Sequence, residues 1–196
     1  MSRKSKTDWF TAGVQLINQD GAKKLTIDAL CQHIGMTKGS FYHHFKGMDN
    51  FIKAFLIYFE EEGTLQIIEQ VEQEESPHAK IRLLIELSTQ YPPELEVGMR
   101  AWAHQDERVQ QVFERVDQQR LDYLTQLWLP LVNDEATARV RGRVLYTILI
   151  GGEHILPPLP RDELRAVFDA TLNAFGVKNE HNQSEQSRMA TGASHR

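Results

Sequence analysis

Two short helical segments close to the N-terminus, separated by a three-residue turn that begins with a glycine, constrain the fold more than any other feature. Residues 27–34 and 38–44 both have the apolar spacing of helices, and Gly35 stands at the turn between them. Glycine tolerates the positive φ that a sharp turn requires. Thr26 and Thr37 are suited to cap the N-termini of the two helices. The pattern therefore predicts a pair of helices that cross closely, in a helix-turn-helix arrangement.

Within this pair, the spacing separates a buried face from an exposed one. Cys31 provides a small apolar side chain where the helices cross, and Phe41 anchors the second helix in the core. Packing explains Cys31 better than a redox switch does, because the chain has no second cysteine. If Phe41 is buried, helical spacing turns Tyr42 and its neighbours outward. A second helix exposed in this way is typical of modules that enter the major groove of DNA.

Nine residues of this segment are candidates for DNA contacts. Backbone N–H groups at a helix N-terminus can bind phosphate, and an exposed tyrosine can bond a phosphate or contact a thymine methyl group. Adjacent histidines point about 100° apart on a helix, so they cannot chelate a metal together. We expect no metal and no cofactor, and we expect DNA contacts from Thr26, Thr37, Lys38, Gly39, Ser40, Tyr42, His43, His44 and Lys46.

The distribution of charge supports this interpretation. The whole chain has a net charge of −5, which by itself argues against binding to a polyanion. Residues 1–47, however, hold seven Lys/Arg and three Asp/Glu, a net +4 that leaves −9 for the remainder. A basic head on an acidic body is expected when only one end of a protein meets nucleic acid, although chance asymmetry in a short window is the alternative.

The remaining periodicity is helical throughout, with no clear period-two strand, and predicts an all-α fold. The polar residues from 177 to 196 are expected to form an unstructured tail. Besides the two short helices, we expect helices over Thr7–Gln19, from Met48 past Tyr58, from Pro77 up to the Pro92-Pro93 break, Val97–Ala103, Glu107–Trp128, Asp134–Ile155 and Arg161–Phe175.

The segment TIDALCQHIGMTKGSFYHHF, residues 26–45, resembles the DNA-binding region of the tetracycline-repressor (TetR) family. That family's pattern runs approximately T-x-x-x-I-A-x-x-x-G-V-S-x-G-x-x-Y-x-H-F. One departure concerns the lysine that usually opens the next helix, because Met48 occupies that position here; Lys46 can substitute as a phosphate contact. The matching positions in this chain are Thr26, Leu30, Cys31, Gly35, Met36, Thr37, Gly39, Tyr42, His44 and Phe45.

The resemblance implies a homodimer with about nine helices per subunit. Residues 1–47 would form the DNA-binding domain, and residues 48–176 a helical domain for effector binding and dimerisation. The last two helices of each subunit would pair with those of the partner. The dimer would bind a near-palindromic operator in double-stranded DNA. A small-molecule effector in the core would control this binding, and the simplest role for such a regulator is that of a repressor.

Aromatic side chains with polar groups are candidates to line the effector site, since such residues are common in ligand pockets. They equally often fill cores, and for any single one of them the core is the favoured alternative. The candidates are Tyr91, Trp102, His104, Phe113, Tyr123, Trp128, Tyr146 and His154.

Other classes of function find little support in the sequence. It contains no G-x-S-x-G, Walker or H-E-x-x-H motif, so we expect a protein that is not an enzyme. It has no long apolar run and no apolar signal segment, and with one cysteine it fits the cytoplasm and no membrane partner. An architectural DNA-binding protein without an effector, or a protein-interaction module with an incidental basic head, remains an alternative.

Overall fold

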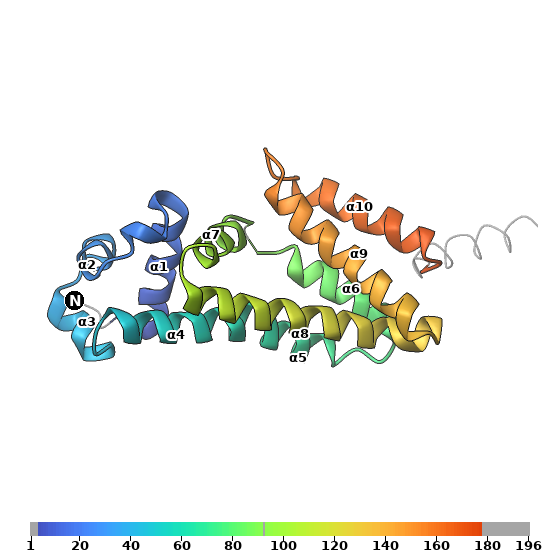
Figure 1. The fold of residues 1–196 in the computed structure, drawn as a ribbon, viewed down its shortest axis with the longest axis horizontal. Coiled ribbons are helices and arrows are strands. Elements are labelled where there is room, and N and C mark those ends of the chain that lie inside the picture. Colours follow the sequence, from blue (N-terminus) through green and yellow to red (C-terminus); the bar gives the residue numbers. More distant parts are fainter. Residues whose placement is uncertain (1–3, 92, 178–196) are drawn as a thin grey trace, which may run out of the picture.

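A computed structural model describes residues 4–91 and 93–177 of the chain, and these residues contain helices but no strand (Figure 1). Their helical elements are α1 (Lys6–Asp20), η1 (Ala22–Lys24), α2 (Ile27–Ile34), α3 (Lys38–His44), α4 (Met48–Glu60), η2 (Glu61–Leu65), α5 (Gln66–Val71), α6 (Pro77–Ser88), α7 (Pro93–Ala103), α8 (Glu107–Val132), α9 (Glu135–His154) and α10 (Arg161–Ala174). The all-α prediction is confirmed.

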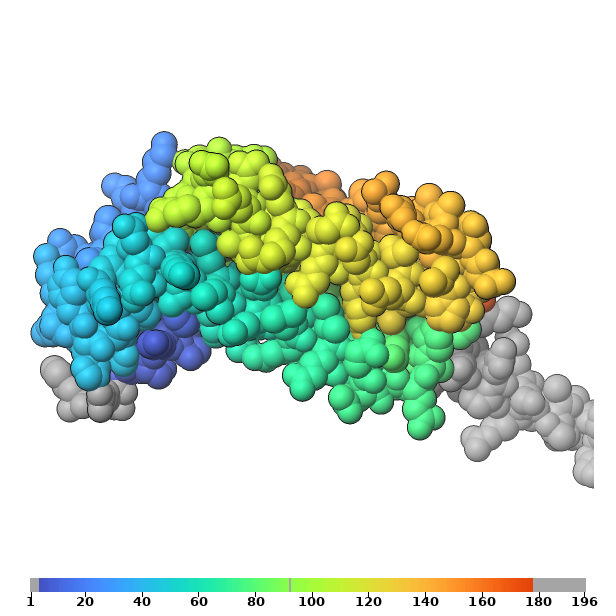
Figure 2. Space-filling view, turned by 60° about the horizontal axis from the view of Figure 1, so that its bottom comes forward, coloured from blue at the N-terminus to red at the C-terminus, as the bar shows by residue number. Residues whose placement is uncertain are grey.

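The elements α4, η2 and α5 form one continuous helix, whose middle turn, η2, has π-helical hydrogen bonding. The backbone stays helical from Glu60 through Gln66, so the described residues form nine main helices rather than ten. This long helix lies along α8 over much of the molecule (Figure 2). Arg115 of α8 joins the two through hydrogen bonds of 2.9 and 2.6 Å to Glu60 of α4.

The head consists of α1, α2 and α3 packed around large aromatic side chains. Trp9 of α1 meets Phe41 of α3 edge to face, with ring centroids 5.4 Å apart. Phe51 and Phe55 of α4 stack beneath them, and both are fully buried. The same core cluster continues into Trp102 of α7, so the head is seated on the rest of the molecule through shared apolar packing.

The body is a second cluster formed by α5, α6, the second half of α8, α9 and α10. Helices α8 and α9 approach each other closely, because a Cβ on Gly142 would lie 3.1 Å from Cβ of Leu124. Trp128 of α8 is completely buried there. In Figure 1, α9 and α10 lie side by side at the end of the molecule away from the head. The domain boundary between residues 47 and 48 stays a prediction.

Most helix limits agree with the sequence prediction, but α7 begins at Pro93 rather than at Val97, and α8 ends later than predicted. We expected this helix to end near Trp128, but it continues through Pro130 to Val132. Proline removes the hydrogen bond to the carbonyl four residues earlier, which here belongs to Gln126. Gln126 is exposed, so water can satisfy its carbonyl group. Asn133, in the left-handed conformation with φ 51°, then ends the helix.

Of the tail expected over residues 177–196, only Val177 is described, and it is buried against the body. The rest of that tail lies outside the described residues. Among the described helices, none has the length and apolarity needed to cross a membrane.

Candidate DNA-binding and ligand-binding sites

The turn between α2 and α3 has the geometry that the sequence predicts. Gly35 ends α2 in the left-handed region, with φ 69° and ψ 36°. Thr26 Oγ1 accepts a 3.1 Å hydrogen bond from the Ala29 N–H, and Thr37 Oγ1 accepts one of 3.3 Å from the Ser40 N–H. Both threonines are therefore N-caps, which fix where α2 and α3 begin.

The two faces of α3 are also as predicted. Phe41 has no exposed surface, whereas 55% of Tyr42 is exposed. Cys31 is buried on α2, and this burial raises the pKa of its thiol. The Tyr42 side of α3 is thus directed away from the core and is open to a partner.

Lys38, at the start of α3, has a partner that the sequence analysis did not foresee. Its ammonium group lies 2.6 Å from the Asp28 carboxylate of α2. The hydrogen bond to Asp28 and the negative charge of that group raise the pKa of Lys38. Both side chains are exposed, so the pair contributes little to stability and can open when a phosphate competes.

The remaining candidates extend the exposed surface around α3. Gly39 is exposed, and a Cβ added there would meet only Thr37 Oγ1, at 3.6 Å. Ser40 and His44 are half-buried, and His43 is exposed with its ring against that of His44. Lys46 is exposed just beyond the helix. The structure therefore places eight of the nine predicted DNA-contact residues on α3 and its two flanking turns, while Thr26 lies at the start of α2.

A cavity of about 310 Å³ lies where the head meets the body. Its walls include Thr11 and Val14 of α1 together with Phe55 and Tyr58 of α4, while Phe168 of α10 lines it from the body. The walls are predominantly apolar, and the volume is at the lower end of the range for small-molecule sites. A ligand here would touch both parts of the molecule at once.

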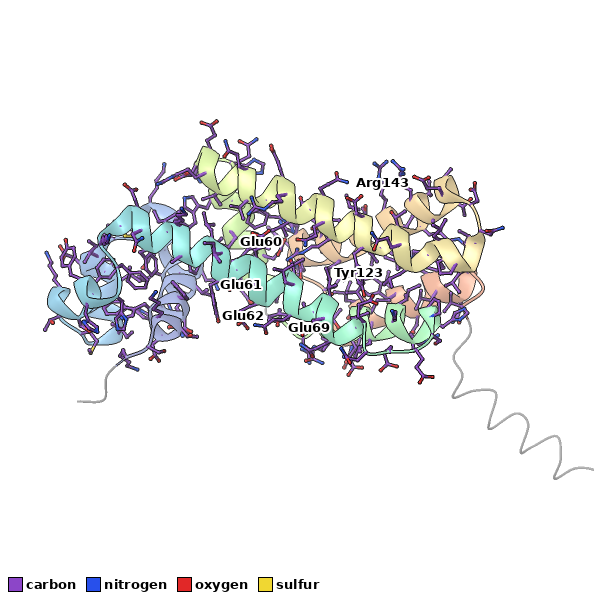
Figure 3. The ribbon with its side chains drawn as sticks, turned by 90° about the horizontal axis from the view of Figure 1, so that it is seen from below. Glu60, Glu61, Glu62, Glu69, Tyr123 and Arg143 are labelled. Carbon is purple, nitrogen blue, oxygen red and sulfur yellow. The ribbon has the colours of Figure 1, made fainter. Side chains whose placement is uncertain are left out.

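Three of the eight candidate ligand residues line this cavity, namely Tyr91, Tyr123 and Tyr146. Their hydroxyl groups are already hydrogen-bonded: Tyr91 donates to the Glu62 carbonyl oxygen, Tyr123 to Glu72 and Tyr146 to Asp117. Figure 3 shows Tyr123 between α8 and the long helix formed by α4, η2 and α5.

The other five candidates lie elsewhere in the molecule. Trp102 and Phe113 belong to the core shared by head and body, and Trp128 belongs to the core of the body. His104 and His154 are exposed, and Nδ1 of His154 lies 2.8 Å from the Ile150 carbonyl oxygen. For the three aromatic residues, helical spacing could not distinguish a core wall from a cavity wall.

The sequence analysis missed a network of charged side chains beside the cavity. Arg100 makes two hydrogen bonds of 2.9 and 2.7 Å to Asp117, and a third of 2.8 Å to the Tyr146 hydroxyl. Glu96 lies 2.7 Å from Arg100 and 3.3 Å from Arg120. Charged residues on helices usually face solvent, so no local pattern in the sequence marks these as buried.

Glu153 of α9 also lines the cavity and was not singled out from the sequence. Only 9% of this residue is exposed, and its Oε2 atom is buried without a hydrogen-bond partner. Burial raises the pKa of Glu153 to about 7, with a further increase from the Glu96 carboxylate that Arg120 and Arg100 partly offset. Near neutral pH, the Glu153 carboxyl group is therefore protonated in part of the molecules and ionised in the rest.

Glu153→Gln should stabilise the protein at high pH more than at low pH. The pKa of Glu153 is higher in the folded chain, about 7, than its usual value of 4.5, so the folded state holds the proton more tightly. That contribution is fully present below about pH 4.5 and is lost as the pH rises towards about 7. We expect the variant to gain on the order of 2 kcal/mol in unfolding free energy between about pH 5 and about pH 8, relative to wild type.

Urea denaturation at both pH values measures this gain. Glu86→Gln, which makes the same change at an exposed position outside the cavity, is the matched control and should show no such trend. An equal effect of the two substitutions at both pH values would contradict the raised pKa of Glu153.

Comparison with known proteins agrees with this geometry. Residues 10–55 match the family model of bacterial regulatory proteins, tetR family. No curated protein matches the chain in sequence.

Solved structures share the fold over most of the chain. A TetR-family transcriptional regulator from Streptomyces coelicolor superimposes with a TM-score of 0.70 at 16% identity, covering 88% of each chain. A transcriptional regulator from Rhodococcus sp. Rha1 also has a TM-score of 0.70, at 15% identity, covering 87% of this chain and 95% of its own. A TetR transcription regulator from Haloarcula marismortui has a TM-score of 0.65 at 22% identity, covering 88% of this chain and 95% of its own.

The helix-turn-helix head on a larger helical body defines a DNA-binding transcriptional regulator. Residues 10–55 match the tetR family model, and the fold of the chain as a whole resembles that of solved TetR-family regulators.

Proposed function

We propose that the protein binds a near-palindromic operator in double-stranded DNA as a homodimer, and represses transcription until a small molecule occupies the cavity. The observation that carries the DNA-binding proposal is the orientation of α3, which buries Phe41 and exposes Tyr42. An exposed recognition helix with its N-terminal residues uncovered can enter the major groove. This function requires access to the chromosome and therefore a cytoplasmic location.

The outer surface of α9 and α10 supports the proposed dimer. Small or apolar residues on these helices are exposed at helical spacing, as expected for a face that packs closely against a second copy. The exposed residues are Ala136, Val140, Thr147 and Gly151 on α9, and Ala166, Val167, Ala170 and Ala174 on α10. A symmetric dimer through this face would leave both heads available for two half-sites about 34–36 Å apart.

The position of the cavity supports control by an effector. Because α1 and α4 contribute Val14 and Phe55 to its walls, a bound molecule would contact the elements that seat the head on the body. A ligand changes an equilibrium between two arrangements only if it binds one of them more tightly. A molecule that fits only when the head has shifted would favour that arrangement. It would lower DNA affinity to the extent that it binds the shifted arrangement more tightly than the other.

Two experiments in sequence test the proposal. Fragments that the protein binds are first selected from random DNA, and small molecules are then screened for release of the selected fragment. A near-palindromic consensus and at least one releasing compound are expected. Ile85→Trp is the matched control, because Ile85 lines the cavity and the larger side chain should fill it. The variant should still bind DNA, but the releasing compound should no longer displace the DNA. If no DNA sequence is enriched above background, the proposed regulator function is wrong.

Lys46→Ala should lower DNA affinity by a similar factor for the operator and for unrelated DNA. Lys46 is exposed beside α3, where its ammonium group can reach a phosphate, and phosphate contacts carry no sequence information. The slope of log affinity against log salt concentration should become less steep by about 1. Fluorescence anisotropy over a salt series measures both effects.

The control for this experiment is Lys53→Ala, which removes another exposed lysine further along α4. It should leave the salt slope nearly unchanged. If Lys46→Ala lowered affinity for the operator alone, Lys46 would be a base contact rather than a phosphate contact.

A further inference from the structure

The unpartnered carboxyl group of Glu153 sets the chemistry of the cavity. A buried polar atom is nearly always hydrogen-bonded, and an exception calls for an explanation such as a ligand. Oε2 of Glu153 is such an exception, because it is buried and accepts no hydrogen bond from the described residues. The side chain lines the cavity, so a bound molecule can reach it.

The cavity's guanidinium group, on Arg120, is already engaged by other partners. Its Nε donates to Thr64 Oγ1 at 3.0 Å, and one Nη donates to the Gly63 carbonyl oxygen at 3.1 Å. The other Nη contacts both carboxylate oxygens of Glu96 at 3.3 Å. The donors of Arg120 are therefore engaged by Glu96, by the Gly63 carbonyl group and by the Thr64 hydroxyl group, and no hydrogen bond among the described residues joins Arg120 to Glu153.

Arg100 is not among the residues that line the cavity, and both of its Nη groups are engaged, whereas its buried Nε has no hydrogen-bond partner among the described residues. It makes two hydrogen bonds to Asp117 and lies 2.7 Å from Glu96. Neither arginine directs an uncompensated positive charge at the cavity. An anionic ligand would thus find no available cation and would face the carboxyl group of Glu153.

The formal charges on the cavity walls also favour a cation. The charged residues that line it are three glutamates, Glu62, Glu96 and Glu153, and one arginine, Arg120. The aromatic rings of Phe55, Phe59 and Phe168 contribute to the apolar part of the walls. Such rings attract cations through their π faces and exclude water from an ion pair.

We propose that the effector is an apolar organic cation, and that Glu153 binds its ammonium group. This inference rests on the proposed function, because it assigns a chemical class to the molecule that occupies the cavity. The ammonium group donates the hydrogen bond that Oε2 lacks, and its charge balances the ionised carboxylate. The raised pKa of Glu153 agrees with a carboxyl group that lacks its counter-ion when the cavity is empty.

Three probes with one apolar part and different polar groups test the inference: phenylbutylamine, phenylbutanol and phenylbutyrate. Isothermal titration calorimetry on the full-length chain at about pH 8 gives the affinity for each. We expect the amine to bind at least about tenfold more tightly than the alcohol, and the carboxylate to bind most weakly. Glu153→Gln should remove the preference for the amine while changing alcohol binding less than about twofold. Glu86→Gln should behave like wild type.

The possible failures are distinguishable. If the alcohol binds but the amine binds no more tightly, or if Glu153→Gln keeps the preference, the inference is wrong while the cavity remains a ligand site. If none of the three probes binds, and Ile85→Trp does not alter release of DNA by any compound, the proposed effector site is wrong and the inference with it. Thermal denaturation of Glu153→Gln verifies that the variant is folded.

Discussion

Tyr42→Ala is expected to weaken operator binding more than tenfold without unfolding the protein. The tyrosine is 55% exposed on α3, and its ring makes an edge-to-face contact with Phe41, at 5.7 Å between centroids. Truncation therefore removes little buried apolar area and leaves the core intact. A good contact at a base edge is worth about 1–3 kcal/mol, which corresponds to roughly five- to 150-fold in affinity.

Fluorescence anisotropy with the selected operator measures this loss, and circular dichroism shows that the variant stays helical. Gln19→Ala is the control, because Gln19 is an exposed residue near the end of α1 and lies outside the helix-turn-helix. Tyr42→Phe separates the hydroxyl group from the ring. Unchanged affinity in Tyr42→Ala would mean that α3 is not the element that contacts DNA.

Ala170→Glu is expected to convert the dimer to a monomer and to weaken operator binding at least about a hundredfold. Ala170 is exposed on α10 in the single chain, so the longer side chain has room within one subunit. In the proposed dimer it would bury an unpaired charge in an apolar interface, which costs several kcal/mol. A monomer also loses the advantage of binding two linked half-sites.

Sedimentation velocity measures the mass of the variant, and anisotropy measures its affinity for the full operator and for one half-site. The half-site affinity should change little, because α3 is untouched. Ala101→Glu makes the same substitution at an exposed position of α7 and should stay dimeric. If Ala170→Glu remained a dimer, the partner surface would lie elsewhere than α10.

The helix-turn-helix could be predicted from the sequence almost residue by residue, and the reason is local. The limits of α2 and α3 depend on Thr26, Gly35 and Thr37, whose effects act within one turn of helix. The buried position of Phe41 then follows from helical spacing, which the structure confirms. The ion pair between Lys38 and Asp28 could not be predicted in this way. It joins α2 and α3, so it depends on the angle at which these two helices cross.

The cavity could not be predicted to the same degree, because it is formed by helices that are distant in sequence. Tyr123 and Trp128 lie five positions apart on α8, yet one lines the cavity and the other fills the core of the body. Their amino-acid types give no reason to separate them. The environment of Glu153 depends on Glu96 and Arg120 from two other helices, so its lack of a partner is visible only in three dimensions.

The π-helical turn η2 is another feature that helical spacing alone did not reveal. Gly63 and Thr64 of this turn line the cavity, and both are held by Arg120. Such turns occur often at functional sites, because the extra residue shifts the backbone groups and side chains that follow. The turn therefore lines the cavity and continues directly from α4, which carries part of the head's core.

Amide hydrogen exchange of the full-length protein, with and without the selected operator, tests most directly whether the helix-turn-helix contacts DNA. We predict that new protection on DNA addition is concentrated in residues 26–46, with its maximum at the start of α3. Protection confined to the body, with no change over residues 26–46, would contradict it.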